Sequence, residues 1–280
     1  MDEGSAVVTV SILFCLILAH VAADFLFQWE KIIKYRFDAR RQKRLWGNAL
    51  HSGTYLIATF FITFPWISTA VFWTVIFAAC IHFLIDTIKS EIIKFKPKTR
   101  DSIGLFLGDQ FVHLVSLLFL WVVLLKGDMQ DLFIYFRRYT MGTDIPSEKI
   151  ILAGLLFIVG LWGVGHFIKI YNCRLHYLTS KRKNEADKVI KFDIESELEN
   201  GVYTGGFIIG LLERTFIMIA IVFGLPNETI GFALATKSIA RFKKFDDDRF
   251  VEYFIIGTLI SYISAIIIGK LIQRILFSPI

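Results

Sequence analysis

The stretch Ala6–Phe27 reads AVVTVSILFCLILAHVAADFLF, an apolar run whose charged and imidazole groups, Asp24 and His20, come near its end. A helix needs about 20 mostly apolar residues to cross the hydrocarbon core of a bilayer, so this stretch predicts a membrane-spanning helix. His20 and Asp24 are four residues apart and therefore share one face of that helix. Because ionisable side chains are costly to place in a membrane, the pair indicates a functional site.

The same apolar pattern recurs along the chain, which is 55% hydrophobic and has a mean hydropathy of +0.58. Backbone polar groups in lipid must be satisfied within their own segment, so the apolar stretches are expected to be helices. We therefore predict an all-α fold, a polytopic transmembrane helix bundle with seven spans. The predicted spans are Ala6–Phe27, Leu45–Ile67, Ala70–Ile93, Ile103–Leu125, Ile150–Tyr171, Tyr203–Gly224 and Phe250–Ile272. The shorter stretch Ile230–Phe242 is expected to be a broken or re-entrant helix.

Basic residues set the expected orientation of the spans. They are dense in residues 31–44, 94–100 and 174–191, whereas residues 1–5 and 64–69 contain no Lys or Arg. The positive-inside rule places the basic loops in the cytoplasm and the N-terminus outside. The net charge of +6 is then a topology signal with contacts to anionic membrane lipids, and nucleic-acid binding is not expected.

Histidines occupy positions 20, 51, 82 and 113, one in each of the first four spans and 31 residues apart. In the predicted topology, all four lie in the third of the membrane that borders the cytoplasm. On the inward first and third helices an Asp follows its His by four residues, whereas on the outward fourth helix Asp109 precedes His113. This reversal keeps each Asp about 6 Å closer to the cytoplasm than its His. The pattern predicts one shared layer of polar side chains.

An internal repeat agrees with this layer. A shift of 62 residues superimposes His20 on His82, Asp24 on Asp86, Asn48 on Gln110 and His51 on His113. The match fails where Gly47 stands against Asp109. The repeat predicts two-helix halves related by a pseudo-two-fold axis along the membrane normal. We expect a four-helix membrane unit at residues 1–126, an extracytoplasmic loop at 127–149, and a C-terminal membrane unit at 150–280.

The chemistry of the layer favours a divalent metal. Imidazole and carboxylate are ordinary ligands of Zn²⁺, Fe and Mn, and helix bundles build metal sites from inward-facing side chains of this spacing. We predict a site for one or two ions, with Zn²⁺ the preferred metal. The expected ligands are His20, Asp24, His51, His82, Asp86, Asp109 and His113. Structural polar packing between helices is the alternative. Haem is disfavoured because carboxylates do not suit a porphyrin pocket.

Other polar residues are assigned supporting roles. Gln28 and Gln110 are predicted to assist catalysis, while Asn48 and Lys89 are expected to bind or orient the substrate. In the C-terminal half, Glu213 is a candidate general base. Arg214, Lys237 and Arg241 are candidate ligands of an anionic substrate. Buried ion pairing, for example between Lys237 and Glu213, is the alternative for this second set.

Several motifs resemble those of a family of bacterial membrane proteins known only as a domain of unknown function. The N-terminal motifs are His20-x3-Asp24-Phe25-x2-Gln28, His51, His82-x3-Asp86-x2-Lys89 and Asp109-Gln110-x2-His113. The C-terminal ones are Gly210-Leu211-x-Glu213-Arg214, Lys237-Ser238-x2-Arg241-Phe242 and Gly257-Thr258-x2-Ser261. This resemblance implies the cytoplasmic membrane of a bacterium and transfers no activity. A fainter similarity links the His/Asp pattern to membrane-embedded metal-dependent hydrolases, including the alkaline ceramidase and adiponectin-receptor superfamily, although the order and spacing of ligands differ.

Three classes of function remain open. The leading hypothesis is a metal-dependent membrane enzyme that hydrolyses a lipid or other amphiphilic substrate entering from the inner leaflet. The second is a divalent-cation or proton transporter that uses the same residues, although such sites are expected near the membrane midplane. The third is an effector or interaction protein with a structural polar core. Membrane lipids are the expected partners, and homo-oligomerisation is left open.

Overall fold

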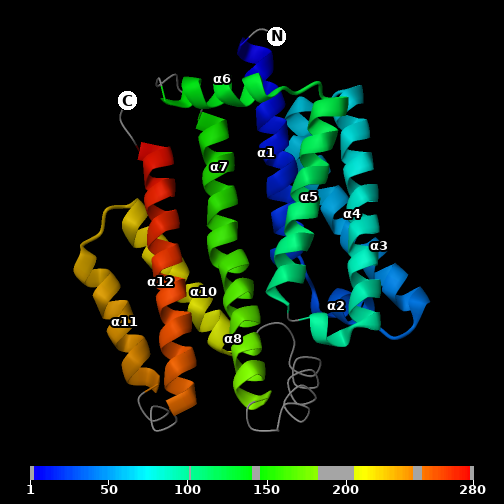
Figure 1. The fold of residues 1–280 in the computed structure, drawn as a ribbon. Coiled ribbons are helices and arrows are strands. Elements are labelled where there is room, and N and C mark those ends of the chain that lie inside the picture. The colour runs from blue at the N-terminus through cyan, green and yellow to red at the C-terminus, as the bar shows by residue number, and fades with distance from the viewer. Residues whose placement is uncertain (1–2, 101, 141–145, 182–204, 242–247, 278–280) are drawn as a thin grey trace. The chain divides into compact units, whose positions relative to one another are not determined.

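The computed structural model describes residues 3–100, 102–140, 146–181, 205–241 and 248–277. The chain is helical almost throughout these ranges, and no β-strand occurs in them (Figure 1). The all-helical class predicted from the sequence is confirmed. Two compact units divide between Leu155 and Leu156.

The first unit is built on four long helices, α1, α3, α4 and α5 (Figure 1). In α1, 72% of the most apolar stretch is buried, compared with 39% or less in the other helices that are long and apolar enough to span a membrane. Helix α1 packs against α3, α5 and α6, and α4 packs against both α3 and α5. The helices of this unit are α1 (Glu3–Phe25), α2 (Glu30–Arg36), α3 (Arg41–Thr63), η1 (Phe64–Trp66), α4 (Thr69–Phe95), η2 (Pro97–Thr99), α5 (Ile103–Leu124), α6 (Met129–Thr140) and most of α7 (Pro146–Ile158).

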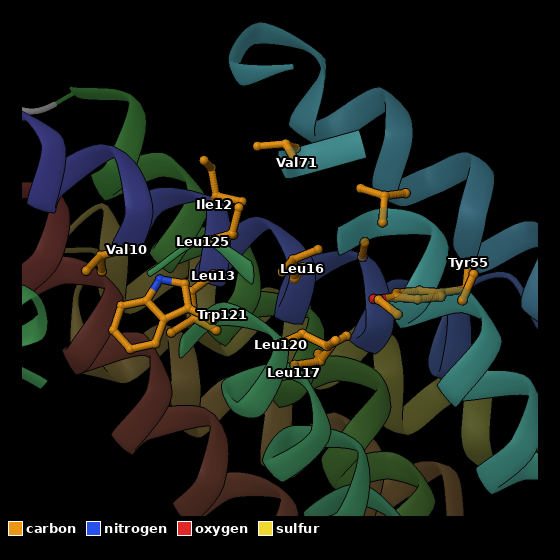
Figure 2. Close-up of a cluster of buried hydrophobic side chains, with 14 of the residues drawn as sticks. Val10, Ile12, Leu13, Leu16, Tyr55, Val71, Leu117, Leu120, Trp121 and Leu125 are labelled. Carbon is orange, nitrogen blue, oxygen red and sulfur yellow. The ribbon is translucent and has the colours of Figure 1, made fainter. Parts of the chain in front are cut away.

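An apolar core holds α1 against its neighbours (Figure 2). Leu13 and Leu16 of α1 belong to one buried cluster with Leu117 and Trp121 of α5. The Trp121 indole N–H donates a hydrogen bond to the Thr9 carbonyl oxygen at 2.9 Å, which satisfies the polar atom of a fully buried ring. This core fixes the relative rotation of α1 and α5, and so it decides which residues they direct at the polar layer.

Serine residues cap the N-terminal ends of α4 and α5. The Ser68 hydroxyl accepts a hydrogen bond from the Val71 N–H at 3.3 Å, and α4 starts at Thr69. The Ser102 hydroxyl accepts one from the Leu105 N–H at 3.4 Å at the start of α5. Such caps satisfy N–H groups that the first helical turn leaves without partners.

The second unit contains α8 (Val164–Lys181), α10 (Gly205–Val222), α11 (Asn227–Arg241) and α12 (Asp248–Phe277). A π-helical turn, η3 (Val159–Gly163), joins α7 to α8. Helix α12 packs against α10 and α8, around a core that includes Ile217, Met218 and Tyr262.

Within the described residues, five helical segments are long and apolar enough to span a membrane, so two of the seven predicted spans are not confirmed. The five are Gly4–Phe25, Thr69–Phe95, Ile103–Leu124, Lys149–Cys173 and Phe254–Phe277. Helix α3 covers the predicted span Leu45–Ile67, but its buried side carries Asn, His, Ser and Thr, which lowers its apolar content. The described part of the predicted span Tyr203–Gly224 forms helix α10 with 18 residues, and the first two residues of that span lie outside the described ranges.

The predicted loop at 127–149 contains a helix, α6, which packs against α1. The Tyr135 and Phe14 rings lie 5.4 Å apart between centroids. The Asp131 carboxylate accepts a hydrogen bond from the Asp128 N–H at 2.9 Å, which caps the start of the helix. With 12 residues, α6 is too short to cross a membrane, which is why the segment reads as a loop by hydropathy.

Candidate metal centre

The four predicted histidines meet inside the first unit, each from a different long helix. The His20 and His113 rings are stacked with centroids 4.5 Å apart, and the His82 ring lies 4.6 Å from that of His113 and 5.1 Å from that of His51. The polar layer expected from the sequence is therefore present in the structure. We call its members the His/Asp cluster: His20, Asp24, His51, His82, Asp86, Asp109 and His113, all at most 7% exposed.

Four ligand atoms of the cluster form a compact group. His51 Nε2 lies 3.0 Å from Asp24 Oδ1 and 3.4 Å from Asp86 Oδ2. His82 Nε2 lies 3.6 Å from Asp24 Oδ1 and 3.5 Å from Asp86 Oδ2. Ligands at about 2.0–2.1 Å from a tetrahedral Zn²⁺ are about 3.3–3.4 Å apart, so these spacings suit a single ion of that size. All four ligand atoms lie within 4.8 Å of one another, so the group could hold a metal ion.

A second group lies on the other side of Asp24. Asp24, Asp109 and His113 also offer ligand atoms that lie within 4.8 Å of one another, and so do His20, His82 and His113. The His113 Nδ1 atom is 3.0 Å from the Asp109 main-chain carbonyl oxygen. Because a carbonyl oxygen only accepts, Nδ1 carries the proton and Nε2 keeps its lone pair. Metal-bound histidines are commonly oriented by this kind of hydrogen bond.

Several inward-facing atoms of the cluster have no hydrogen-bond partner among the described residues. They are Nε2 of His20, His82 and His113, Oδ1 of Asp109 and Oδ2 of Asp86, and Nδ1 of His51 and His82 also lacks a partner among the described residues. An unsatisfied buried polar atom costs about 1–3 kcal/mol, and native proteins contain few of them. A cluster of such atoms, all of metal-ligating types, fits a cation better than it fits polar packing alone.

Two cationic side chains hold the outer oxygens of two carboxylates. Arg36 Nη2 lies 2.6 Å from Asp86 Oδ1, and Lys89 Nζ lies 2.6 Å from Asp109 Oδ2. Each pair leaves the other oxygen of its carboxylate facing the histidines. Three carboxylates against these two cations leave one negative charge if the imidazoles are neutral, which a divalent ion would compensate.

Arg36 is a site residue that the sequence did not predict. It belongs to the short helix α2 and reads as one basic residue in a basic loop. A Cβ atom at Gly47 would overlap the Arg36 main-chain nitrogen and lie 2.6 Å from the Tyr35 carbonyl carbon, so only glycine lets α2 lie this close to α3. In the sequence, Gly47 stands out as a position where the 62-residue repeat fails.

The polar residues next to the cluster brace α2, α3 and α4 together. Asn48 Oδ1 accepts from Arg36 Nε at 3.1 Å, and Asn48 Nδ2 donates to Ser90 Oγ at 3.1 Å. Arg44 donates to Glu91 Oε1 at 2.6 Å. The predicted substrate-binding role of Asn48 remains a prediction, since these bonds by themselves give it an orienting role.

The other predicted site residues fall into two sets. Gln110 Nε2 donates to Asp24 Oδ2 at 2.8 Å, which places it in the cluster. Gln28 follows α1 and is half-buried, and among the described residues no hydrogen bond links it to the cluster. Lys89 lies at the cluster, where it forms an ion pair with Asp109.

The predicted residues of the C-terminal half lie in the second unit. Arg214 is buried and donates from Nε and Nη2 to the Leu161 carbonyl oxygen at 3.1 and 2.8 Å, and from Nη1 to Ser261 Oγ at 3.2 Å. Glu213 is half-buried on the same helix. The side chains of Lys237 and Arg241 lie outside the described part of the structure, so the predicted pairing of Lys237 with Glu213 stays a prediction.

Comparison with known families confirms the resemblance to an uncharacterised family. Residues 12–139 match a family described as protein of unknown function (DUF3307). The matched region contains the whole His/Asp cluster together with Arg36 and Lys89. No curated protein and no solved structure is significantly similar to the chain.

Proposed function

We propose that this protein is a metal-dependent membrane hydrolase that acts on a lipid or other amphiphilic substrate at the cytoplasmic leaflet. One observation carries the proposal: the group of Asp24, His51, His82 and Asp86, with spacings that suit one Zn²⁺-sized ion. Its nitrogen and oxygen donors are those that zinc enzymes use, and the apolar helices around it favour a substrate that partitions into lipid.

The residues around the group would perform separate tasks. Asp24, His51, His82 and Asp86 would hold the ion, and a bound zinc ion would supply a water that ionises near pH 7. Arg36 fixes Asp86 by its outer oxygen, so that Oδ2 stays directed at His51 and His82. Gln110 fixes Asp24 in the same way from the other side. The basic residues of the α2 region would attract a substrate with an anionic head group.

Hydrolysis is tested by isotope incorporation. The purified, zinc-loaded protein is incubated in H₂¹⁸O with vesicles of bacterial polar lipid extract, and the products are analysed by mass spectrometry. The proposal expects ¹⁸O in a lipid product, at least ~100-fold less product with Asp86→Asn, and loss of product after chelation. Asp38→Asn, which changes a carboxylate outside the cluster, is the matched control and should retain the activity.

The same vesicles distinguish the competing classes. If a metal-loaded protein yields no ¹⁸O-labelled product from any lipid, the hydrolase proposal is wrong. Movement of Zn²⁺ or protons across reconstituted vesicles that is abolished by Asp86→Asn would then assign the cluster to transport. Neither product nor ion flux, with an intact fold, would assign it to structural packing.

A further inference from the structure

The two oxygens of Asp24 face different partners. Oδ1 lies 3.0 Å from His51 Nε2 and 3.6 Å from His82 Nε2. Oδ2 lies 3.8 Å from His20 Nε2 and accepts a hydrogen bond from Gln110 Nε2 at 2.8 Å. One carboxylate therefore separates two sets of ligand atoms, and it offers one oxygen to each of them.

The second set resembles the first in composition. Asp109 Oδ1 and His113 Nε2 are buried and have no hydrogen-bond partner among the described residues, and the lone pair of His113 Nε2 is free because Nδ1 holds the proton. The His20 ring stacks on that of His113, with its Nε2 also lacking a hydrogen bond in the described region. These atoms are more numerous than a single four-ligand ion would use.

The cationic partners follow the same division. Arg36 neutralises the outer oxygen of Asp86 in the first set, and Lys89 neutralises that of Asp109 in the second. Each set has one carboxylate of its own with one oxygen secured by a cation and the other oxygen turned inward. The carboxylates and their basic partners are thus divided between the two sets in the same way as the histidines.

We propose that the His/Asp cluster holds two divalent ions bridged by Asp24. The first ion is bound by His51, His82 and Asp86, and the second by Asp109 and His113, with His20 beside it. This inference rests on the proposed function and deepens it, because paired ions about 3.5–4 Å apart can hold both the attacking and the leaving oxygen of a hydrolysis.

Manganese is the probe that tests the two-ion arrangement. The detergent-solubilised full chain is stripped with chelator, loaded with Mn²⁺ and desalted, and bound Mn²⁺ is counted by mass spectrometry and examined by low-temperature EPR. We expect two Mn²⁺ per chain with an exchange-coupled spectrum. Asp109→Asn is expected to retain one Mn²⁺ with an uncoupled spectrum, and Asp38→Asn is expected to retain two coupled ions.

The outcomes separate this inference from the function on which it rests. One uncoupled Mn²⁺ in the unsubstituted protein would overturn the two-ion centre and leave a single-ion hydrolase intact. No bound Mn²⁺ or Zn²⁺ would overturn both. Because the unsubstituted protein alone decides between these results, a variant that fails to fold does not prevent the test.

Discussion

At the scale of single residues, Arg36 and Asp86 form one of the two short ion pairs of the centre. Both side chains are almost fully buried, and the pair is 2.6 Å long. A buried pair contributes little net stability compared with an apolar pair, but the removal of one partner leaves the other charge without compensation. The pair is thus a sensitive probe of the geometry described above.

Replacement of Arg36 is expected to destabilise the protein. Arg36→Gln should lower the free energy of unfolding by about 3–5 kcal/mol, measured by denaturant titration in detergent micelles. Arg40→Gln, which removes an exposed guanidinium paired with Asp38, should cost less than about 1 kcal/mol. Equal effects of the two substitutions would show that Arg36 does not neutralise Asp86.

The sequence predicts the ligands of the centre better than it predicts their supports. A His and an Asp four residues apart share a helix face whatever the tertiary structure, so His82 and Asp86 can be paired from sequence. The Arg36 side chain reaches Asp86 only because of the path of α2, and helix periodicity contains no information about that path. Lys89 could be recognised by its motif, but its pairing with Asp109 depends on the rotation of α4 against α5.

At the scale of secondary structure elements, the approach of α2 to α3 depends on one glycine. Gly47→Ala is expected to push α2 away from α3, and so to separate Arg36 from Asp86 and lower the unfolding free energy, because its Cβ would overlap the main chain at Arg36. Gly53→Ala on the same helix meets nothing within 4 Å and should instead stabilise by about 0.5–1 kcal/mol through helix propensity. Thermal unfolding in detergent measures the change in stability for both variants. A Gly47→Ala variant as stable as the unsubstituted protein would contradict the close approach of α2 to α3.

In the second unit, the buried Arg214 side chain links the π-helical turn η3 to α12 by hydrogen bonds. The guanidinium donates twice to the Leu161 carbonyl oxygen within the π-helical turn and once to Ser261. We expect Arg214→Leu to cost about 1–3 kcal/mol of stability by leaving these acceptors unsatisfied. Its metal content should equal that of the unsubstituted protein, because every ligand lies in the first unit. A loss of bound metal without a loss of stability would assign Arg214 to the metal centre instead.

Elements that depend on hydropathy were predictable, and elements that depend on packing were not. The apolar runs that became α1, α4, α5 and α12 are evident in the sequence. Helix α3 was predicted as a span, but its buried polar residues, which include Asn48 and His51, make it much less apolar than its neighbours. Helices α2 and α6 and the π-turn η3 arise from contacts between elements, which no hydropathy average contains.

At the scale of the whole molecule, the orientation in the membrane remains a prediction from the basic loops. Arg40 lies between α2 and α3, Ile67 lies between η1 and α4, and both residues are exposed. Each is replaced by Cys in a protein from which the native cysteines have been removed. A membrane-impermeant thiol reagent added to intact cells should label Ile67→Cys and should label Arg40→Cys only after lysis. The reverse pattern would place the centre at the outer face and contradict the assignment to the cytoplasmic leaflet.

Zinc titration decides whether the His/Asp cluster is a metal centre. Chelator-stripped protein is titrated with Zn²⁺ by calorimetry, beside His82→Ala in the cluster and His166→Ala in the second unit as a matched control. We expect tight binding by the unsubstituted protein and by His166→Ala, and at least ~100-fold weaker binding by a folded His82→Ala. Absence of binding by the unsubstituted protein, or undiminished binding by His82→Ala, would contradict it.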